Sequence, residues 1–211
     1  MILGRLRIPA TLIGLVIGIA GLIIDYWQFM PGMTAESGAV GAFIGFWSYF
    51  THLTNLMIVL IYLANLTGAG WLGWARAPRT EALMAGYIAL VMVFYHFLLA
   101  PYFTFEGWLL VATILLHYVA PTLYLIWWLA FARHGGLRFT DVPLMLAPGL
   151  IYVAVILARG ALTGIYPYDI LDAGQNGYGG VAIGVGIIAA AVALFSALAV
   201  LVDRWIAARQ G

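Results

Sequence analysis

Two polar residues inside apolar stretches have the side-chain types needed for nucleophilic chemistry. Thr51 lies in the segment Tyr49-Phe50-Thr51-His52-Leu53-Thr54-Asn55-Leu56, and His117 precedes Pro121 by four residues. A threonine hydroxyl is a weak nucleophile until a base takes its proton, and a neutral imidazole is the usual base. Pro121 cannot donate to the His117 carbonyl, so we expect a bend that opens space beside the imidazole. If the two side chains meet, Thr51 could attack an ester carbonyl while His117 carries the proton.

Other polar residues fall at a similar depth in their apolar stretches. Counted at about 1.5 Å per residue, Thr51, His96 and His117 lie roughly 12–15 Å from the same side of the membrane, and Asp25 about 7 Å. An oxyanion formed at Thr51 needs hydrogen-bond donors, for which the Asn55 amide is the first candidate. Asp25 is a candidate to orient an imidazole, and it could equally cap its own helix. The residues predicted to bind an oxyanion or the substrate are Asn55, His52, His96, Ser48 and Tyr124.

The elements that must position these residues are apolar helices. Of 211 residues, 65% are hydrophobic and 8% are charged, against about 25% charged in soluble domains, and the mean hydropathy is +1.05. Runs long enough to cross about 30 Å of hydrocarbon indicate an all-α, polytopic membrane protein and exclude a soluble enzyme. The predicted spans of this single domain, residues 1–211, are 8–30, 43–66, 82–104, 107–131, 142–159 and 181–203. Within them, Gly14/Gly18 and Gly41/Gly45 favour close packing inside the bundle over dimerisation.

The few charges predict the orientation of the chain and exclude some partners. All nine basic residues are arginines, and this lysine-free, Ala- and Gly-rich composition suggests a bacterial protein of the cytoplasmic membrane. Positive residues favour the cytoplasmic side, so both termini are expected there. A net charge of +1 makes nucleic-acid binding unlikely, and the absence of cysteine excludes thiolate chemistry. The arginines that mark the cytoplasmic side are Arg5, Arg7, Arg76, Arg79, Arg133, Arg138, Arg204 and Arg209.

The longest stretch predicted to be non-helical lies on the opposite side of the membrane. It runs from Gly160 to Gly180 and contains Tyr166-Pro167-Tyr168-Asp169. Its length fits either a cover over the outer mouth of the bundle or a loose connection. Arg159 and Asp169 could bind a polar head group or a carboxylate at that entrance, and an ion pair or snorkelling would explain them equally well.

The segment around Thr51, followed by His117 and Pro121, resembles the androgen-induced-gene family, which includes ADTRP and bacterial relatives. The resemblance covers most of the chain in size, span number and motif placement. It implies a multipass hydrolase of fatty acid esters of hydroxy fatty acids, with Thr51 as the nucleophile and His117 as the histidine. His52 differs from the aromatic or apolar residue usual in animal members, and the spacing from His117 to Pro121 is shorter.

Three other functions remain open on the sequence. His52, His96 and His117 with Asp25 could hold Zn²⁺ in a lipid hydrolase, although their spacing matches no zinc motif. A haem between histidines is a less favoured reading. The polar layer could also belong to a small transporter or a lipid-binding protein without catalytic activity. The preferred prediction is an esterase acting on lipid or fatty-acyl esters, without a cofactor, a metal or a protein partner.

Overall fold

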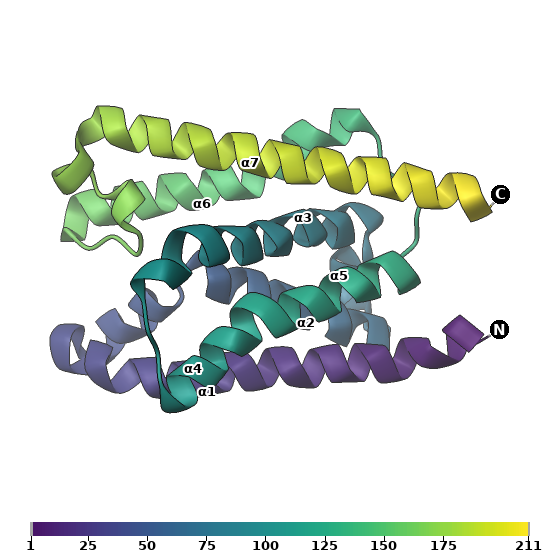
Figure 1. Ribbon diagram of the computed structural model, residues 1–211, viewed down its shortest axis with the longest axis horizontal. Coiled ribbons are helices and arrows are strands. Elements are labelled where there is room, and N and C mark those ends of the chain that lie inside the picture. Colours follow the sequence, from purple (N-terminus) through teal and green to yellow (C-terminus); the bar gives the residue numbers. More distant parts are fainter. Residues whose placement is uncertain (1, 211) are drawn as a thin grey trace.

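The computed structural model describes residues 2–210, and these residues form a bundle of helices without any strand. Six helical segments are long and apolar enough to cross a membrane, which confirms the predicted all-α, multi-pass fold. The first and last helices bring both chain ends to the same end of the bundle (Figure 1). The helices are α1 (Ile2–Phe46), α2 (Phe50–Thr67), α3 (Pro78–Phe94), α4 (Gly107–Ile114), α5 (Ala120–Phe131), α6 (Val142–Thr163) and α7 (Ala173–Gln210).

Two of the predicted span boundaries are wrong because helical structure continues beyond the apolar runs. Helix α1 extends to Phe46 and bends at Gly38, whose φ of 70° and ψ of 170° suit a residue without Cβ. Residues 30–43 are therefore helical on either side of Gly38, where the chain turns back and brings the Phe46 ring to 5.1 Å from the Tyr26 ring. Helix α7 likewise begins at Ala173 and bends at Gly177, so the stretch expected to be non-helical from 160 to 180 is reduced to a connection of residues 164–172, which itself contains the 3₁₀ helix η6 (Asp169–Leu171). Helices satisfy their backbone groups internally, which favours helix right up to the membrane surface.

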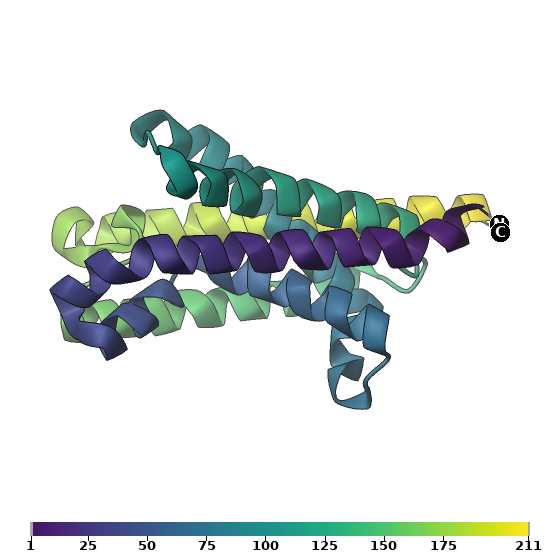
Figure 2. The same ribbon diagram turned by 90° about the horizontal axis from the view of Figure 1, so that it is seen from below.

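Helix α1 packs closely against α2 at two of its glycines. A Cβ atom on Gly18 would lie 2.7 Å from the Val59 side chain, and one on Gly14 would overlap the Tyr62 ring. This pair of glycines therefore serves packing inside the bundle, as small residues do in membrane helices. Figure 2 shows α1 running between α2 on one side and the α4–α5 span on the other. The Asp25 region of α1 is thereby held beside both partners of the predicted Thr51–His117 pair.

The third and fourth spans each leave α-helical geometry at a histidine. A π-helical segment, η2 (Tyr95–Leu99), contains His96, and a second one, η4 (Leu115–Val119), contains His117. Pro121 follows in the first turn of α5, so the bend expected from its missing N–H takes the form of a π-helical turn. Such turns widen a helix locally and occur often at functional sites.

Candidate active site

Thr51 lies at the start of a helix, directly after the turn that joins α1 and α2. Tyr49 is extended, with φ of −80° and ψ of 129°, and α2 begins at Phe50 without a side-chain cap. The first N–H groups of a helix have no partner within it and form the positive end of its dipole. The Thr51 hydroxyl is therefore held in a region that favours developing negative charge.

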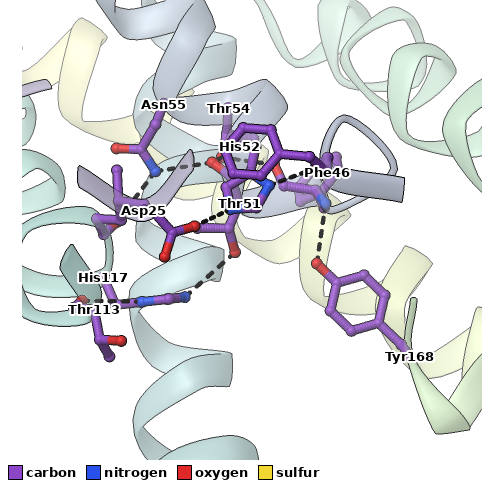
Figure 3. Close-up of polar contacts among 11 residues, drawn as sticks. Asp25, Phe46, Thr51, His52, Thr54, Asn55, Thr113, His117 and Tyr168 are labelled. Carbon is purple, nitrogen blue, oxygen red and sulfur yellow. Dashed lines mark hydrogen bonds and ion pairs between the residues drawn. The ribbon is translucent and has the colours of Figure 1, made fainter. Parts of the chain in front are cut away.

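The structure brings the Thr51 hydroxyl to the His117 imidazole. The distance from Thr51 Oγ1 to His117 Nε2 is 3.4 Å (Figure 3). On the other side of the ring, Nδ1 lies 3.0 Å from the Thr113 carbonyl oxygen. A carbonyl only accepts, so Nδ1 carries the hydrogen and the lone pair of a neutral ring is at Nε2, facing Thr51. The contact is longer than the 2.6–3.2 Å of a tight catalytic hydrogen bond, as is common without substrate.

An aromatic ring covers one face of the His117 imidazole. Tyr95 stacks on the imidazole with ring centroids 3.8 Å apart and an interplanar angle of 24°. Tyr95 is buried, and it belongs to the first of the two π-helical segments. The two π-helical turns therefore meet at this site, one carrying the imidazole and the other carrying the ring that covers it.

Asn55 ties the helix of Thr51 to the π-helical turn of His117. Its Nδ2 donates to the Thr51 carbonyl at 2.8 Å and to the Leu116 carbonyl at 3.1 Å. These bonds use both amide hydrogens, so the amide is not free to donate to an oxyanion in this conformation. Asn55 is fully buried and joins the residue that carries the nucleophile to the residue before the base. The structure therefore gives Asn55 a positioning role in place of the predicted oxyanion role.

Asp25 orients an imidazole, and that imidazole belongs to His52. The Asp25 carboxylate lies 2.6 Å from His52 Nε2, while His52 Nδ1 lies 2.5 Å from the Phe46 carbonyl oxygen. The Phe46 ring stacks on the imidazole, with centroids 3.8 Å apart. Each ring nitrogen of His52 therefore faces an acceptor oxygen. The pair joins the Asp25 turn in the middle of α1 to the start of α2, and the Phe46 contact joins the last residue of α1 to the same imidazole, so both help to fix the position of Thr51 (Figure 3).

Tyr168 is a site residue that the sequence analysis did not single out. Its hydroxyl accepts the Phe50 N–H at 2.9 Å, and it lies close to the side chain and backbone of Thr51. Although part of the ring is exposed, the hydroxyl is desolvated, which raises the pKa of Tyr168 to about 12. The hydroxyl is thus neutral near pH 7 and can donate. The one sequence feature that could have indicated Tyr168 is its place in Tyr166-Pro167-Tyr168-Asp169, within the segment predicted to cover the outer mouth of the bundle.

A mainly apolar cavity of about 700 Å³ opens on Thr51 and Tyr168. This volume is within the range of about 300–1,000 Å³ typical of ligand sites. Helices α3, α6 and α7 supply its apolar walls, and the 164–172 connection closes one side through residues 167–171. Representative wall residues are Leu90, Leu98, Leu150, Val153, Ile188 and Val192.

Several predicted site residues lie elsewhere. His96 is exposed on the bundle surface, where its Nδ1 lies 3.1 Å from the Tyr118 hydroxyl. Tyr124 is buried and donates to the Glu81 carbonyl at 2.9 Å. Neither residue is brought to Thr51. His96 was predicted at the same depth but lies on another helix face, and Tyr124 lies about two turns further along its span than His117.

The remaining predicted residues lie around the site, and none of their hydrogen bonds is to Thr51 or His117. Ser48 donates to the Ile44 carbonyl at 2.6 Å, inside the turn that leads to Thr51. Asp169 is exposed and lines the mouth of the apolar cavity. Arg159 donates to the Ile165 carbonyl at 3.5 Å, and no ion pair joins it to Asp169 in the described part of the chain.

The four residues of the zinc alternative do not assemble. Asp25 and His52 are paired, His117 contacts Thr51, and His96 faces away from all three. Within residues 2–210, no group of three or more His, Asp and Glu side chains is arranged to hold a metal ion. The geometry therefore does not supply the ligand set that a zinc-bound water requires.

The fold and the geometry define a multi-pass membrane protein with a threonine–histidine contact beside an apolar cavity. No known protein family, curated protein or solved structure matches the chain.

Proposed function

We propose that the protein is an integral-membrane esterase that cleaves fatty-acyl esters with Thr51 as nucleophile and His117 as base. The observation that carries this proposal is the position of the Thr51 hydroxyl between two features. His117 Nε2 lies 3.4 Å away on one side, and the cavity of about 700 Å³ opens on the other. A nucleophile must reach its base and its substrate at the same time. Thr51 contacts His117 and also lines the cavity, so it can do so.

In the first half of the reaction, the acyl group is transferred to the threonine. His117 Nε2 accepts the Thr51 proton as the hydroxyl oxygen bonds to the ester carbonyl carbon, which gives a tetrahedral oxyanion. The ester C–O bond then breaks, and the imidazolium returns the proton to the departing alkoxide. The Thr113 carbonyl holds the ring in the required tautomer throughout.

The oxyanion is stabilised by groups at the start of α2. The N–H groups of the first helical turn point out of the helix end, and the Phe50 N–H contacts the Tyr168 hydroxyl there. The Phe50, His52 and Leu53 N–H groups already have partners, so the Tyr168 hydroxyl is the donor beside Thr51 that replaces Asn55 as the oxyanion candidate. In the second half of the reaction, water gives a proton to His117 and its oxygen attacks the acyl-threonine carbonyl. The imidazolium then returns this proton to the Thr51 oxygen as the bond between that oxygen and the acyl carbon breaks. The products are a carboxylic acid and free Thr51.

The surroundings of the site indicate its substrates. Apolar walls and a position within the membrane-spanning bundle favour acyl chains that arrive from the lipid. Arginines flank the end of the bundle that holds both termini, and we assign that end to the cytoplasmic side of a bacterial cytoplasmic membrane. Thr51 then opens toward the outer leaflet.

Covalent labelling with a fluorophosphonate that carries a lipid chain tests the proposal. The purified protein should be labelled, and mass spectrometry should place the adduct on Thr51. The Thr51→Ala variant should lose labelling. Thr54→Val is the matched control, because Thr54 lies three residues later on α2 and its hydroxyl donates to the Phe50 and Thr51 carbonyls. Labelling of Thr51→Ala at the parent level would rule out the assigned nucleophile.

Turnover of fatty-acyl esters should accompany labelling and should survive treatment with a metal chelator. Activity that is lost on chelation, restored by zinc and retained in Thr51→Ala would instead support the metal-dependent alternative. Reversible lipid binding without turnover in the parent protein would identify a lipid-binding protein.

Removing the Asn55 side chain is expected to reduce the labelling rate by about 10²-fold, since small displacements of reacting groups have effects of this size. Asn55→Ala loses the links to Thr51 and Leu116 that hold the nucleophile beside the base. The measurement is the rate of fluorophosphonate labelling, made well below the unfolding temperature of each variant. A folded Asn55→Ala protein that reacts at the parent rate would exclude the positioning role.

A further inference from the structure

A second cavity, separate from the one at Thr51, lies toward the end of the bundle that holds both termini. Its volume is about 520 Å³, and no residue lines both cavities. The lining comes from α1, α2, α3, the 3₁₀ helix η1 (Gly70–Arg76) and the chain just after α5. The lining residues are Arg7, Asn65, Gly73, Arg76, Glu81 and Arg133.

The charges around this cavity are unbalanced. Three guanidinium groups and one carboxylate line it, which leaves a formal charge of +2. Within the described part of the chain, none of these arginines forms an ion pair, whereas Arg79 nearby is paired with Asp141 at 2.9 Å. Glu81 is held by Asn65, whose Nδ2 donates to its Oε1 at 3.0 Å. The cavity therefore favours an anion.

The guanidinium groups are held in place with donors to spare. Arg7 donates to Asn65 Oδ1 at 2.9 Å, and Arg76 donates to the Gly68 carbonyl at 3.2 Å. Arg133 donates to the Arg76 carbonyl at 3.0 Å, which joins two of the arginines. Each guanidinium has five N–H donors, and these bonds use only some of them. The Arg76 Nε is buried without a hydrogen-bond partner among residues 2–210, a costly state that a bound anion would relieve.

We propose that this cavity binds a phosphate group. Guanidinium forks match the oxygen geometry of phosphate and form paired, charge-assisted hydrogen bonds. A phosphomonoester carries about −1.5 to −2 charges at pH 7, which balances the charge of the lining. The volume exceeds that of phosphate alone, so part of the molecule that carries the phosphate also fits.

Two sources could supply this phosphate, a lipid headgroup or a soluble phosphate compound. Trp71 and Trp74 on η1 have exposed fractions of 74% and 50%, and tryptophan favours the membrane–water interface. The η1 helix extends away from the rest of the bundle on the side of α2 (Figure 2). The cavity thus lies where both headgroups and soluble anions can reach it.

Thermal unfolding of the full-length protein distinguishes these sources. One arm titrates inorganic phosphate against chloride at matched ionic strength in detergent. The other compares nanodiscs of phosphatidylcholine with nanodiscs that also contain phosphatidic acid. A ligand that binds the folded state raises the unfolding temperature. A shift with inorganic phosphate supports a soluble ligand, a shift only with phosphatidic acid supports a headgroup, and the absence of both shifts overturns the proposal.

Variants connect the shift to the cavity. Arg76→Gln combined with Arg133→Gln should weaken phosphate binding at least tenfold, whereas Arg5→Gln, an exposed arginine outside the cavity, should leave it unchanged. Glu81→Gln removes the negative charge while keeping an oxygen for Asn65, so it should tighten binding. The expected increase in phosphate affinity of Glu81→Gln can be tested even if the double arginine variant does not fold. Equal binding by the parent and Glu81→Gln, or by the parent and a folded double variant, would contradict the assignment.

Discussion

Replacing His117 with glutamine is expected to lower kcat for fatty-acyl ester hydrolysis by about 10²- to 10⁴-fold, the usual contribution of a general base, with little change in KM. Glutamine keeps a polar side chain in the π-helical turn but has no lone pair that can take the Thr51 proton. The substrate contacts in the apolar cavity are unchanged, because His117 does not line it. The measurement is steady-state kinetics on a short-chain and a long-chain acyl ester.

The same substitution at the other π-helical histidine provides the control. His96 is exposed and contacts the Tyr118 hydroxyl, so His96→Gln should retain kcat within about twofold, as expected for surface changes. Equal losses in the two variants would point to a general effect on the fold. Full activity in His117→Gln would remove His117 from the mechanism.

Breaking the Asp25–His52 pair is expected to have the largest effect on stability. Asp25→Ala should lower the free energy of unfolding by about 3–5 kcal/mol, because it leaves a buried imidazole facing an apolar space. The two side chains are 11% and 7% exposed, and their contact distance is 2.6 Å. His52→Ala should have a similar effect, and it also removes the stacking on Phe46.

A double substitution distinguishes the interaction between Asp25 and His52 from the contacts that each residue makes with its other neighbours. Asp25→Leu with His52→Phe replaces both polar groups by apolar ones, and its cost should be well below the sum of the single substitutions. Unfolding would be followed in mixed detergent micelles. Glu36→Ala serves as the control, since Glu36 is exposed. Additive losses in the double variant would show that the two residues act independently.

The expected consequence for the site is that Asp25→Ala also slows Thr51 labelling. The pair joins the Asp25 turn of α1 to the first turn of α2, where the nucleophile lies. From its sequence position alone, Asp25 could cap its helix or orient an imidazole, and nothing in the sequence identifies His52 as its partner. Helix rotation decided this, because it turned the face of α1 that carries Asp25 toward the start of α2.

The sequence by itself determined the number of spans, their approximate positions and the segregation of arginine to one side. Each of these depends on a local property, since a membrane span must satisfy its backbone internally and expose apolar side chains to lipid. Composition along the chain was also enough to select Thr51 and His117 as candidates, because polar groups are rare and costly in such spans.

Only the tertiary structure decided which of these polar groups meet. It directed His96 to the surface, joined Asn55 to the Leu116 carbonyl and placed Tyr168 on the Phe50 N–H. It also gathered three arginines from separate segments around one cavity. The rotation and tilt of a membrane helix depend on packing against neighbours distant in sequence, so a depth calculated along one span cannot predict them. Hydropathy assigns residues to layers of the membrane, whereas contacts between helices build the site.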